Sequence, residues 1–362
     1  MGEAKDPKPP RRRRSFLARF FAFLLVLLIL GGLAAGGAAY WAWERFNAPG
    51  PLAADTFATL EPGDGLNAIA VKLRDAGVIS KDDPFNLGVL DDATIFKLGT
   101  RYLEQQGKLK HGEYKVPAGS SMKQVMELLV SGKVIQYSVT IPEGRTSQMV
   151  LRILNADTTL TGELRAAPAE GALLPETYLF TRGTTRADIL RRMERDHTAL
   201  AEKLWANRKA DLPYDTLEEA IILASIVEKE TGVASERPQV ASVFVNRLRK
   251  GMKLQSDPTI IYGLTGGEPL GRGIRKSELE KATPYNTYVI DGLPPTPICN
   301  PGRASLEAVI NPPDTDYLFF VADGTGGHAF AATLEEHNEN VRKWREIEAQ
   351  RARDAEAAGG TP

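Results

Sequence analysis

The stretch Leu217–Thr231, LEEAIILASIVEKET, predicts one helix that is wrapped in core over most of its circumference and ends in two carboxylates. Turning by about 100° per residue places Glu218, Ser225 and Lys229 on a narrow arc, which we expect to face solvent. Apolar side chains cover the opposite side, at Ala220, Leu223, Ile226 and Val227. The helix should therefore be the central element of a folded domain.

The two carboxylates at the end of this helix differ in their surroundings. Glu230 falls near the middle of the apolar side, and Glu228 falls nearer its edge. Loss of hydration raises the pKa of a carboxyl, so we expect Glu230 to stay protonated near neutral pH, as a general acid requires. The alternative is that both glutamates pair with basic neighbours at a helix end, with Gly232 as the stop signal. The helix alone leaves both interpretations open.

Composition limits the classes of function. The chain has 362 residues, of which 25% are charged and 43% hydrophobic, enough to form two or three domains with buried cores. Its net charge of -1 argues against a nucleic-acid partner. The single cysteine, Cys299, excludes an internal disulfide and a thiolate metal site, and the four histidines form no helix-spaced pair. We therefore expect no metal and no cofactor.

The N-terminus has the pattern of a membrane anchor. Residues 1–19 form a basic tail, and the uncharged run Phe20–Trp43 is long enough to span a bilayer, with aromatic residues near its end. The arginines should stay in the cytoplasm and place residues 44–362 outside. Two alternatives are a cleavage site in the small-residue run Ala34–Ala39 and a twin-arginine export signal in RRSFL, Arg13–Leu17.

Three segments after the anchor share a strand-like run, a glycine turn and a helical pattern. They are TFATLEPGDGLNAIAVKL, YKVPAGSSMKQVMELL and SVTIPEGRTSQMVLRIL, aligned on Gly63, Gly119 and Gly144. Six residues after each glycine stand Ile69, Val125 and Val150, and ten residues after it Leu73, Leu129 and Leu154. This common phase predicts β–turn–α units. The first two resemble the halves of a LysM-like carbohydrate-binding module, and a rigid spacer is the alternative.

The remaining sequence predicts further helices and an ordered loop. We expect amphipathic helices over Arg186–Arg208, Ala241–Lys250 and Thr333–Ala349, and a disordered tail over residues 350–362. In the Pro- and Gly-rich stretch Thr283–Gly302, three polar side chains suit a groove that holds sugars: Tyr285, Asn286 and Tyr288. The alternative is an irregular loop clamped by its own tyrosines.

Five motifs together resemble the bacterial endolytic murein transglycosylases. They are ASIVEKETGVASERPQVASVFVNRL, GMKLQSDPTIIYG, YNTY, GLPPTPICNPG and FVADGTGGHAF. Val227–Thr231 is also similar to the I-x-x-E-S pattern around the catalytic glutamate of lytic transglycosylases, with Thr in place of Ser. Thr296 and Cys299 stand where the family more often has other residues.

The resemblance implies an α+β protein with three parts. They are a transmembrane helix over 20–43, a small LysM-like β/α subdomain over 52–140 and a mainly helical, lysozyme-like catalytic domain over 141–349. It implies an inner-membrane lyase, single-pass and with a periplasmic catalytic domain, that cleaves the MurNAc–GlcNAc β-1,4 bond of nascent peptidoglycan and leaves a 1,6-anhydro-MurNAc end. Peptidoglycan synthases are expected partners.

The family's catalytic glutamate corresponds to Glu230, which agrees with the helix-face argument. Candidates for holding the glycan or orienting Glu230 are Gln255, Ser256, Asp257, Tyr285 and Asn286, and Glu228 is a supporting candidate. Two other functions stay open at this point: a lysozyme-type hydrolase that uses water, and a membrane-anchored glycan-binding scaffold without activity.

Overall fold

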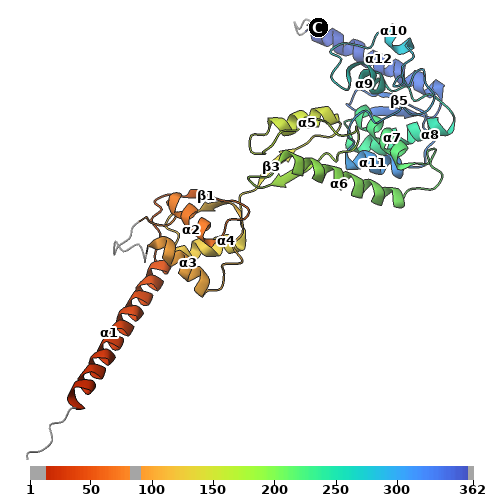
Figure 1. Ribbon diagram of the computed structural model, residues 1–362. Coiled ribbons are helices and arrows are strands. Elements are labelled where there is room, and N and C mark those ends of the chain that lie inside the picture. Colours follow the sequence, from red (N-terminus) through yellow and green to blue (C-terminus); the bar gives the residue numbers. More distant parts are fainter. Residues whose placement is uncertain (1–13, 82–90, 358–362) are drawn as a thin grey trace, which may run out of the picture. The chain divides into compact units, whose positions relative to one another are not determined.

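The structure is a computed structural model that describes residues 14–81 and 91–357 (Figure 1). It is a mixed helix and sheet protein, and the chain divides between Ile135 and Gln136 into two compact units. This division lies a few residues before position 140, where the sequence analysis ended the LysM-like subdomain. Most of the expected cytoplasmic tail, residues 1–13, lies outside the described residues.

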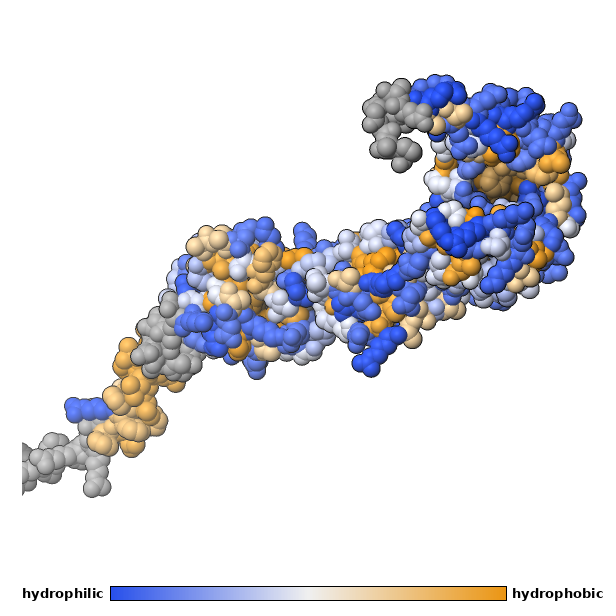
Figure 2. All heavy atoms as spheres, turned by 90° about the horizontal axis from the view of Figure 1, so that it is seen from above, coloured by the Kyte–Doolittle hydropathy of each residue, from blue (hydrophilic) through white to orange (hydrophobic). Residues whose placement is uncertain are grey.

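The first helix, α1 (Arg14–Asn47), is long and apolar enough to cross a membrane over Phe16–Asn47. It extends beyond the predicted Phe20–Trp43 at both ends. Its apolar side chains are exposed, and Figure 2 shows an apolar surface along this helix. Membrane anchors and signal sequences share these properties, so the structure agrees with an anchor and leaves the cleaved alternative open.

In its described residues, 14–81 and 91–135, the N-terminal unit adds one small sheet and three helices to α1. Its further elements are β1 (Thr56–Leu60), α2 (Leu66–Asp75), α3 (Asp92–Tyr102), β2 (Gly112–Val116) and α4 (Met122–Ser131). Strands β1 and β2 pair antiparallel, with Thr56 opposite Val116 and Leu60 opposite Gly112. Phe46 at the end of α1 is buried in the same core as Leu73 and Phe96, so this core includes the last turn of α1.

The predicted β–turn–α repeats are confirmed. The turn glycines Gly63, Gly119 and Gly144 have φ of 91°, 68° and 72°, a left-handed conformation that glycine adopts most readily. All six aligned apolar positions are buried: Ile69, Leu73, Val125, Leu129, Val150 and Leu154. The common apolar phase therefore faces the core in every copy, although the third copy belongs to the C-terminal unit.

The C-terminal unit contains two antiparallel strand pairs among helices (Figure 1). Its first elements are β3 (Tyr137–Thr140), α5 (Ser147–Ala156), β4 (Thr177–Phe180), α6 (Arg186–Ala206), α7 (Leu217–Glu230) and η1 (Ala234–Glu236). Then follow α8 (Arg237–Arg249), α9 (Asp257–Thr265), α10 (Lys276–Glu280), α11 (Arg303–Ile310), β5 (Phe319–Ala322), β6 (His328–Ala331) and α12 (Leu334–Ala357). Strand β3 pairs with β4, and β5 with β6. Helix α7 packs against α8 and α11 in the largest core of the unit.

Helix α7 confirms the predicted central helix but differs on its polar arc. Glu218 and Lys229 are exposed as predicted, whereas Ser225 is fully buried, so its predicted exposure was wrong. The Ser225 hydroxyl donates to the carbonyl of Ile222 at 2.7 Å and accepts from the amide of Ile298 at 3.0 Å. The loop that contains Ile298 covers this part of the arc, and the hydroxyl satisfies its backbone.

The other predicted helices are present with shifted ends. Helix α6 matches the charged pattern of Arg186–Arg208, and α8 begins at Arg237, ahead of the predicted Ala241. Helix α12 continues through Ala357, so the expected disorder of residues 350–362 is wrong for its first part. This segment is rich in Ala, Glu and Arg, which favour helix where no packing opposes it.

Candidate active site

The candidate acid, Glu230, is the last residue of α7. Helix α7 ends there because Thr231 is extended, with φ of −136° and ψ of 132°. The Glu230 carboxylate is recessed, and its Oε1 accepts a hydrogen bond from the hydroxyl of Ser256 at 2.5 Å. Ser256 is itself buried and lies directly before α9. The fold thus brings together two residues that the sequence analysis selected from separate motifs.

The surroundings of Glu230 favour its protonated form. Burial raises the pKa of Glu230 to about 7, because the ionised carboxylate loses hydration there. The hydrogen bond from Ser256 opposes this rise, since it stabilises the charged form. The negative charge of Asp257 raises the pKa of Glu230 further. The positive charges of His328 and Arg247 act against the rise more weakly. A carboxyl with this pKa can both give and take a proton near neutral pH.

Gln255 and Asp257 flank Ser256 and are both exposed. Gln255 has a left-handed backbone with φ of 53°, and its backbone N–H donates to the carbonyl of Thr287 at 3.1 Å. The hydroxyl of Tyr288 donates to Oδ1 of Asp257 at 2.7 Å. The residues on either side of Ser256 are therefore tied to the loop that contains Tyr285 and Asn286, while their side chains stay accessible to a ligand.

Tyr285 and Asn286 have different places in that loop. The side chain of Asn286 is buried, and its amide donates to the carbonyls of Glu278, Leu279 and Lys281. A side chain whose donors are all taken by the backbone has none to offer a sugar, so the expected glycan contact of Asn286 does not fit the structure. Tyr285 is half-buried, and its ring packs 5.0 Å from that of Tyr262.

The two residues that depart from the family pattern both have partners. Thr296 Oγ1 lies 2.7 Å from the hydroxyl of Tyr285 and holds that ring in the loop. Cys299 is fully buried, and its thiol donates to the carbonyl of Ser225 at 3.4 Å. Burial raises the pKa of this thiol well above its usual range, so it stays protonated and inert. Thr296 thus stabilises the loop internally, and Cys299 attaches it to α7 without adding a reactive group.

Glu228 is an anchor of the fold. Its side chain is 4% exposed and accepts from Arg237 at 3.2 Å, from the amide of Gly302 at 2.9 Å and from the hydroxyl of Ser305 at 2.7 Å. Arg237 also pairs with Glu143 at 3.0 Å. A carboxyl group held by this many donors has a structural role. The alternative in which a glutamate pairs with a basic neighbour at the helix end therefore describes Glu228 and not Glu230.

Two further groups near the site, Arg247 and His328, were missed by the sequence analysis. Arg247 is buried and donates to the carbonyls of Leu318 and Leu254 at 2.7 and 2.8 Å. His328 lies 2.7 Å from Oε2 of Glu236, and its backbone amide donates to the same carboxylate. His328 could have been found, because it lies within the motif FVADGTGGHAF. Arg247 also lies within a quoted motif, the one that ends in VNRL, but an arginine near the end of an amphipathic helix is typical of a solvated residue, so its burial was not evident from the sequence.

A half-buried carboxyl, Glu170, was also missed. It accepts from the amide of Ser147 at 2.8 Å and the hydroxyl of Tyr262 at 3.4 Å. Asn300 contributes a third donor at 3.3 Å. Burial raises the pKa of Glu170 above its usual value, against the effect of these hydrogen bonds. Both of its oxygens accept hydrogen bonds from protein donors, whereas Glu230 accepts one from Ser256.

The chain matches the model of the YceG-like family over residues 58–343. Together with the relatives described next, this match shows that the chain belongs to the family of endolytic murein transglycosylases and is an enzyme of the lytic transglycosylase class.

An endolytic murein transglycosylase of Bacillus subtilis is 30% identical over 314 residues, which are 78% of this chain and 82% of that protein. One from Streptococcus pneumoniae serotype 2 is 28% identical over 310 residues, 70% of this chain. The match spans only about half, 54%, of the streptococcal protein. A solved yceG-like protein from Listeria monocytogenes is 29% identical, with a TM-score of 0.46 over 79% of this chain and 98% of that one.

The pH at which kcat/KM falls on the alkaline side of its pH profile, called the alkaline limb, should depend on the hydrogen bond between Glu230 and Ser256. With a pKa of about 7, Glu230 is protonated below neutral pH, so kcat/KM should fall as the pH rises through about 7. Ser256→Ala removes the bond that stabilises the carboxylate, so the alkaline limb should move to higher pH. Ser242→Ala is the matched control, since Ser242 is equally buried and bonds to the Gln239 carbonyl and to Thr315. Unchanged or downward-shifted limbs in Ser256→Ala would contradict the assignment.

Proposed function

We propose that this enzyme cleaves the MurNAc–GlcNAc β-1,4 bond within nascent peptidoglycan strands, leaves a 1,6-anhydro-MurNAc end and so terminates strand elongation. The observation that carries the proposal is the recessed carboxyl of Glu230, whose pKa burial raises to about 7. The names of the relatives support murein as the substrate. The proposal goes further by assigning the bond, the product and the residue.

In the first step, Glu230 donates its proton to the glycosidic oxygen as the bond to C1 of MurNAc breaks. The departing GlcNAc oxygen leaves as a hydroxyl, and C1 becomes oxocarbenium-like. Glu230 is now a carboxylate, and the hydroxyl of Ser256 stabilises this charge through the bond that already exists at 2.5 Å. Ser256 thereby offsets part of the cost of forming a carboxylate in dry surroundings.

In the second step, the C6 hydroxyl of the same MurNAc attacks C1 and closes the 1,6-anhydro ring. Glu230 accepts the proton that this hydroxyl releases, so the acid is regenerated and no water is consumed. An intramolecular nucleophile gains a large effective concentration over a diffusing one. One carboxyl with a pKa near neutrality is sufficient for both steps, because it is the donor first and the acceptor afterwards.

Within the site, we assign glycan contact to Gln255, Asp257 and Tyr285, and the orienting role to Ser256. The first two are exposed beside the acid, and Tyr285 offers an aromatic face on the same loop as Tyr288. Asn286 takes the role of a loop clamp, because its amide is bound to three carbonyls. Glu228 supports the acid by fixing the end of α7.

Outside the site, we propose that the N-terminal unit is a LysM-like module that contacts glycan, and that the C-terminal unit is lysozyme-like. The β–turn–α repeats support the first assignment, and the acid at the end of a buried helix supports the second. Helix α1 would anchor the enzyme in the inner membrane as a single span with the catalytic unit in the periplasm. Peptidoglycan synthases, which make the strands, are proposed partners there.

One observation favours a hydrolase as the second candidate. Asp257 is a second carboxylate whose charge acts on Glu230, and a pair of carboxyls is what water-using glycosidases employ. Its oxygen is held by Tyr288 at 2.7 Å. Mass spectrometry of the released muropeptides separates the two mechanisms, because the anhydro product is lighter than the hydrolysis product by one water.

The two glutamates provide the test of the proposed mechanism. Glu230→Gln keeps the shape of the side chain but donates no acidic proton, so strand cleavage should fall by at least about 10²–10⁴-fold while the fold survives. Glu228→Gln is the matched variant two residues away. It should lower the free energy of unfolding by about 1–3 kcal/mol, because a buried site built for an anion loses its charge, and should retain more activity.

The measurements are cleavage of uncrosslinked strands and thermal unfolding of both purified variants. Near-normal turnover of a folded Glu230→Gln enzyme would refute the role of Glu230. An inactive, stably folded Glu228→Gln enzyme beside it would move the acid to Glu228.

The proposed topology has its own test. Because the positive charges precede the apolar run, a reporter fused after Pro362 should be active only outside the cytoplasm, and the protein should remain in the membrane fraction with α1 attached. Recovery of the mature protein in the soluble fraction, shortened by the length of the N-terminal segment, would show that the run is a cleaved signal instead.

A further inference from the structure

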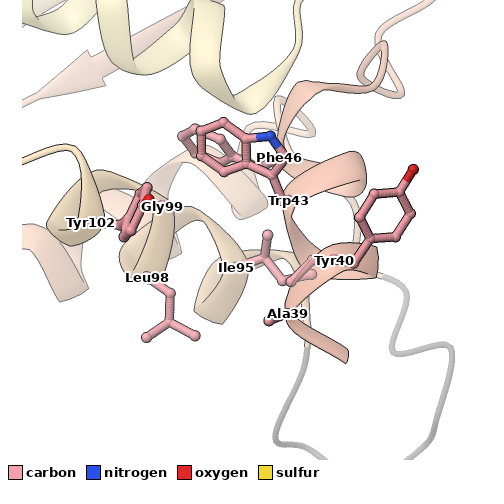
Figure 3. A pocket seen from close by; sticks show the side chains of 9 residues that line it. Ala39, Tyr40, Trp43, Phe46, Ile95, Leu98, Gly99 and Tyr102 are labelled. Atoms are coloured by element: carbon pink, nitrogen blue, oxygen red, sulfur yellow. The ribbon is translucent and has the colours of Figure 1, made fainter. Parts of the chain in front are cut away.

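An apolar groove lies where α3 crosses the last turns of α1 (Figure 3). Its volume is about 660 Å³, and α1 and α3 supply its walls. Four of its side chains are well exposed: Tyr40 (68%), Trp43 (40%), Leu98 (49%) and Tyr102 (77%). We call these four residues the juxtamembrane face.

We propose that the juxtamembrane face inserts into the surface of the bilayer that α1 spans, where phospholipid acyl chains cover it. The inference goes beyond the catalytic site and rests on the anchoring role proposed for α1. It makes α3 a second, interfacial contact of the N-terminal unit with the membrane. The occupant is the lipid of that same bilayer.

The position of the face along α1 supports a lipid partner. The uncharged run Phe20–Trp43 is about 36 Å long at about 1.5 Å per residue, and the hydrocarbon core is about 30 Å thick. Its end, with Tyr40 and Trp43, therefore falls at the membrane–water boundary, where such amphipathic rings prefer to lie. In Figure 3, Leu98 extends from α3 toward the level of Ala39 rather than that of Phe46. The apolar surface of α1 thus continues onto α3.

Helix α3 is fixed to α1, so it must share the depth of that end. Arg45 of α1 donates to both oxygens of Asp92 at the start of α3, at 3.0 and 2.8 Å, and the Asp92 side chain is 2% exposed. Gly99 allows the closest approach, since a Cβ there would lie 2.5 Å from the ring of Phe46. The ring of Trp43 meets that of Tyr102 at 5.8 Å.

The chemistry of the groove fits lipid better than glycan. Its lining consists of Ala39, Tyr40, Ala42, Trp43, Phe46, Ile95, Leu98, Gly99 and Tyr102. This set has no amide or charged side chain to bind sugar hydroxyls. Lys97 and Arg101 lie one turn apart on α3 and directly precede Leu98 and Tyr102, so these cations can reach lipid phosphates while their apolar neighbours insert.

Depth-dependent quenching of the full-length protein in vesicles tests the proposal. A polarity-sensitive fluorophore is attached to Leu98→Cys, and the vesicles contain phosphatidylethanolamine, phosphatidylglycerol and lipids spin-labelled near either end of the acyl chain. Native Cys299 is buried and its pKa is raised by burial, so it should not react. Two matched variants carry the same label: Leu27→Cys within α1, and Phe57→Cys on β1, an exposed apolar position outside the groove.

The label at 98 should show a blue shift and loss of emission, greatest with spin labels near the headgroup. The label at 27 should be quenched most by deep spin labels, and the label at 57 should be unaffected. Quenching at 27 without quenching at 98 overturns the inference and leaves the anchor intact. If the lipid spin labels quench at 27 and not at 98, and labels at 98 on separate copies quench one another, the face binds a second copy of the chain instead of lipid. No quenching at 27 overturns the anchor and the inference together, and equal quenching at 57 shows general adsorption instead of a defined face.

Discussion

The constraint on which the site depends is the removal of one carboxyl from water at the end of a helix. Helix α7 is buried through most of its length, so its C-terminal residue emerges where the core meets the surface. The Glu230 carboxyl has lost enough hydration there for its pKa to rise to about 7. It nevertheless lies beside the exposed residues Gln255 and Asp257, which a glycan strand can reach. Catalysis by a single carboxyl requires both conditions.

The neighbouring elements keep this end of α7 in place. Glu228, two residues before the acid, is bound by Arg237, Gly302 and Ser305, so it fixes the helix end from one side. Ser256 holds Glu230 itself from the start of α9. The same helix end thus carries one glutamate, Glu228, surrounded by hydrogen-bond donors and another, Glu230, that accepts one bond from Ser256 and whose pKa is raised by burial. The difference in their donors, more than their depth, separates the two roles.

Periodicity predicted the elements whose burial follows from local sequence. The three glycine turns and the helices after them are as expected, and the helix-face argument singled out Glu230 within α7. What periodicity missed depends on long-range contacts. Ser225 is buried because the loop at Ile298 covers it, and Asn286 clamps carbonyls of a preceding helix instead of facing a groove. The burial of Arg247 depends on the carbonyl of Leu318, and Glu170 depends on Tyr262 and Asn300, which are all distant in the sequence.

The central claim is that Glu230 keeps its proton near neutral pH, and the most direct measurement is its own titration. Carbon NMR of the full-length enzyme, labelled at glutamate carboxyls and assigned by comparison with Glu230→Gln, follows this group alone. The structure predicts a midpoint at about 7. A midpoint at the ordinary glutamate value of 4.5 would show that Glu230 is ionised at neutral pH and would contradict its role as the acid.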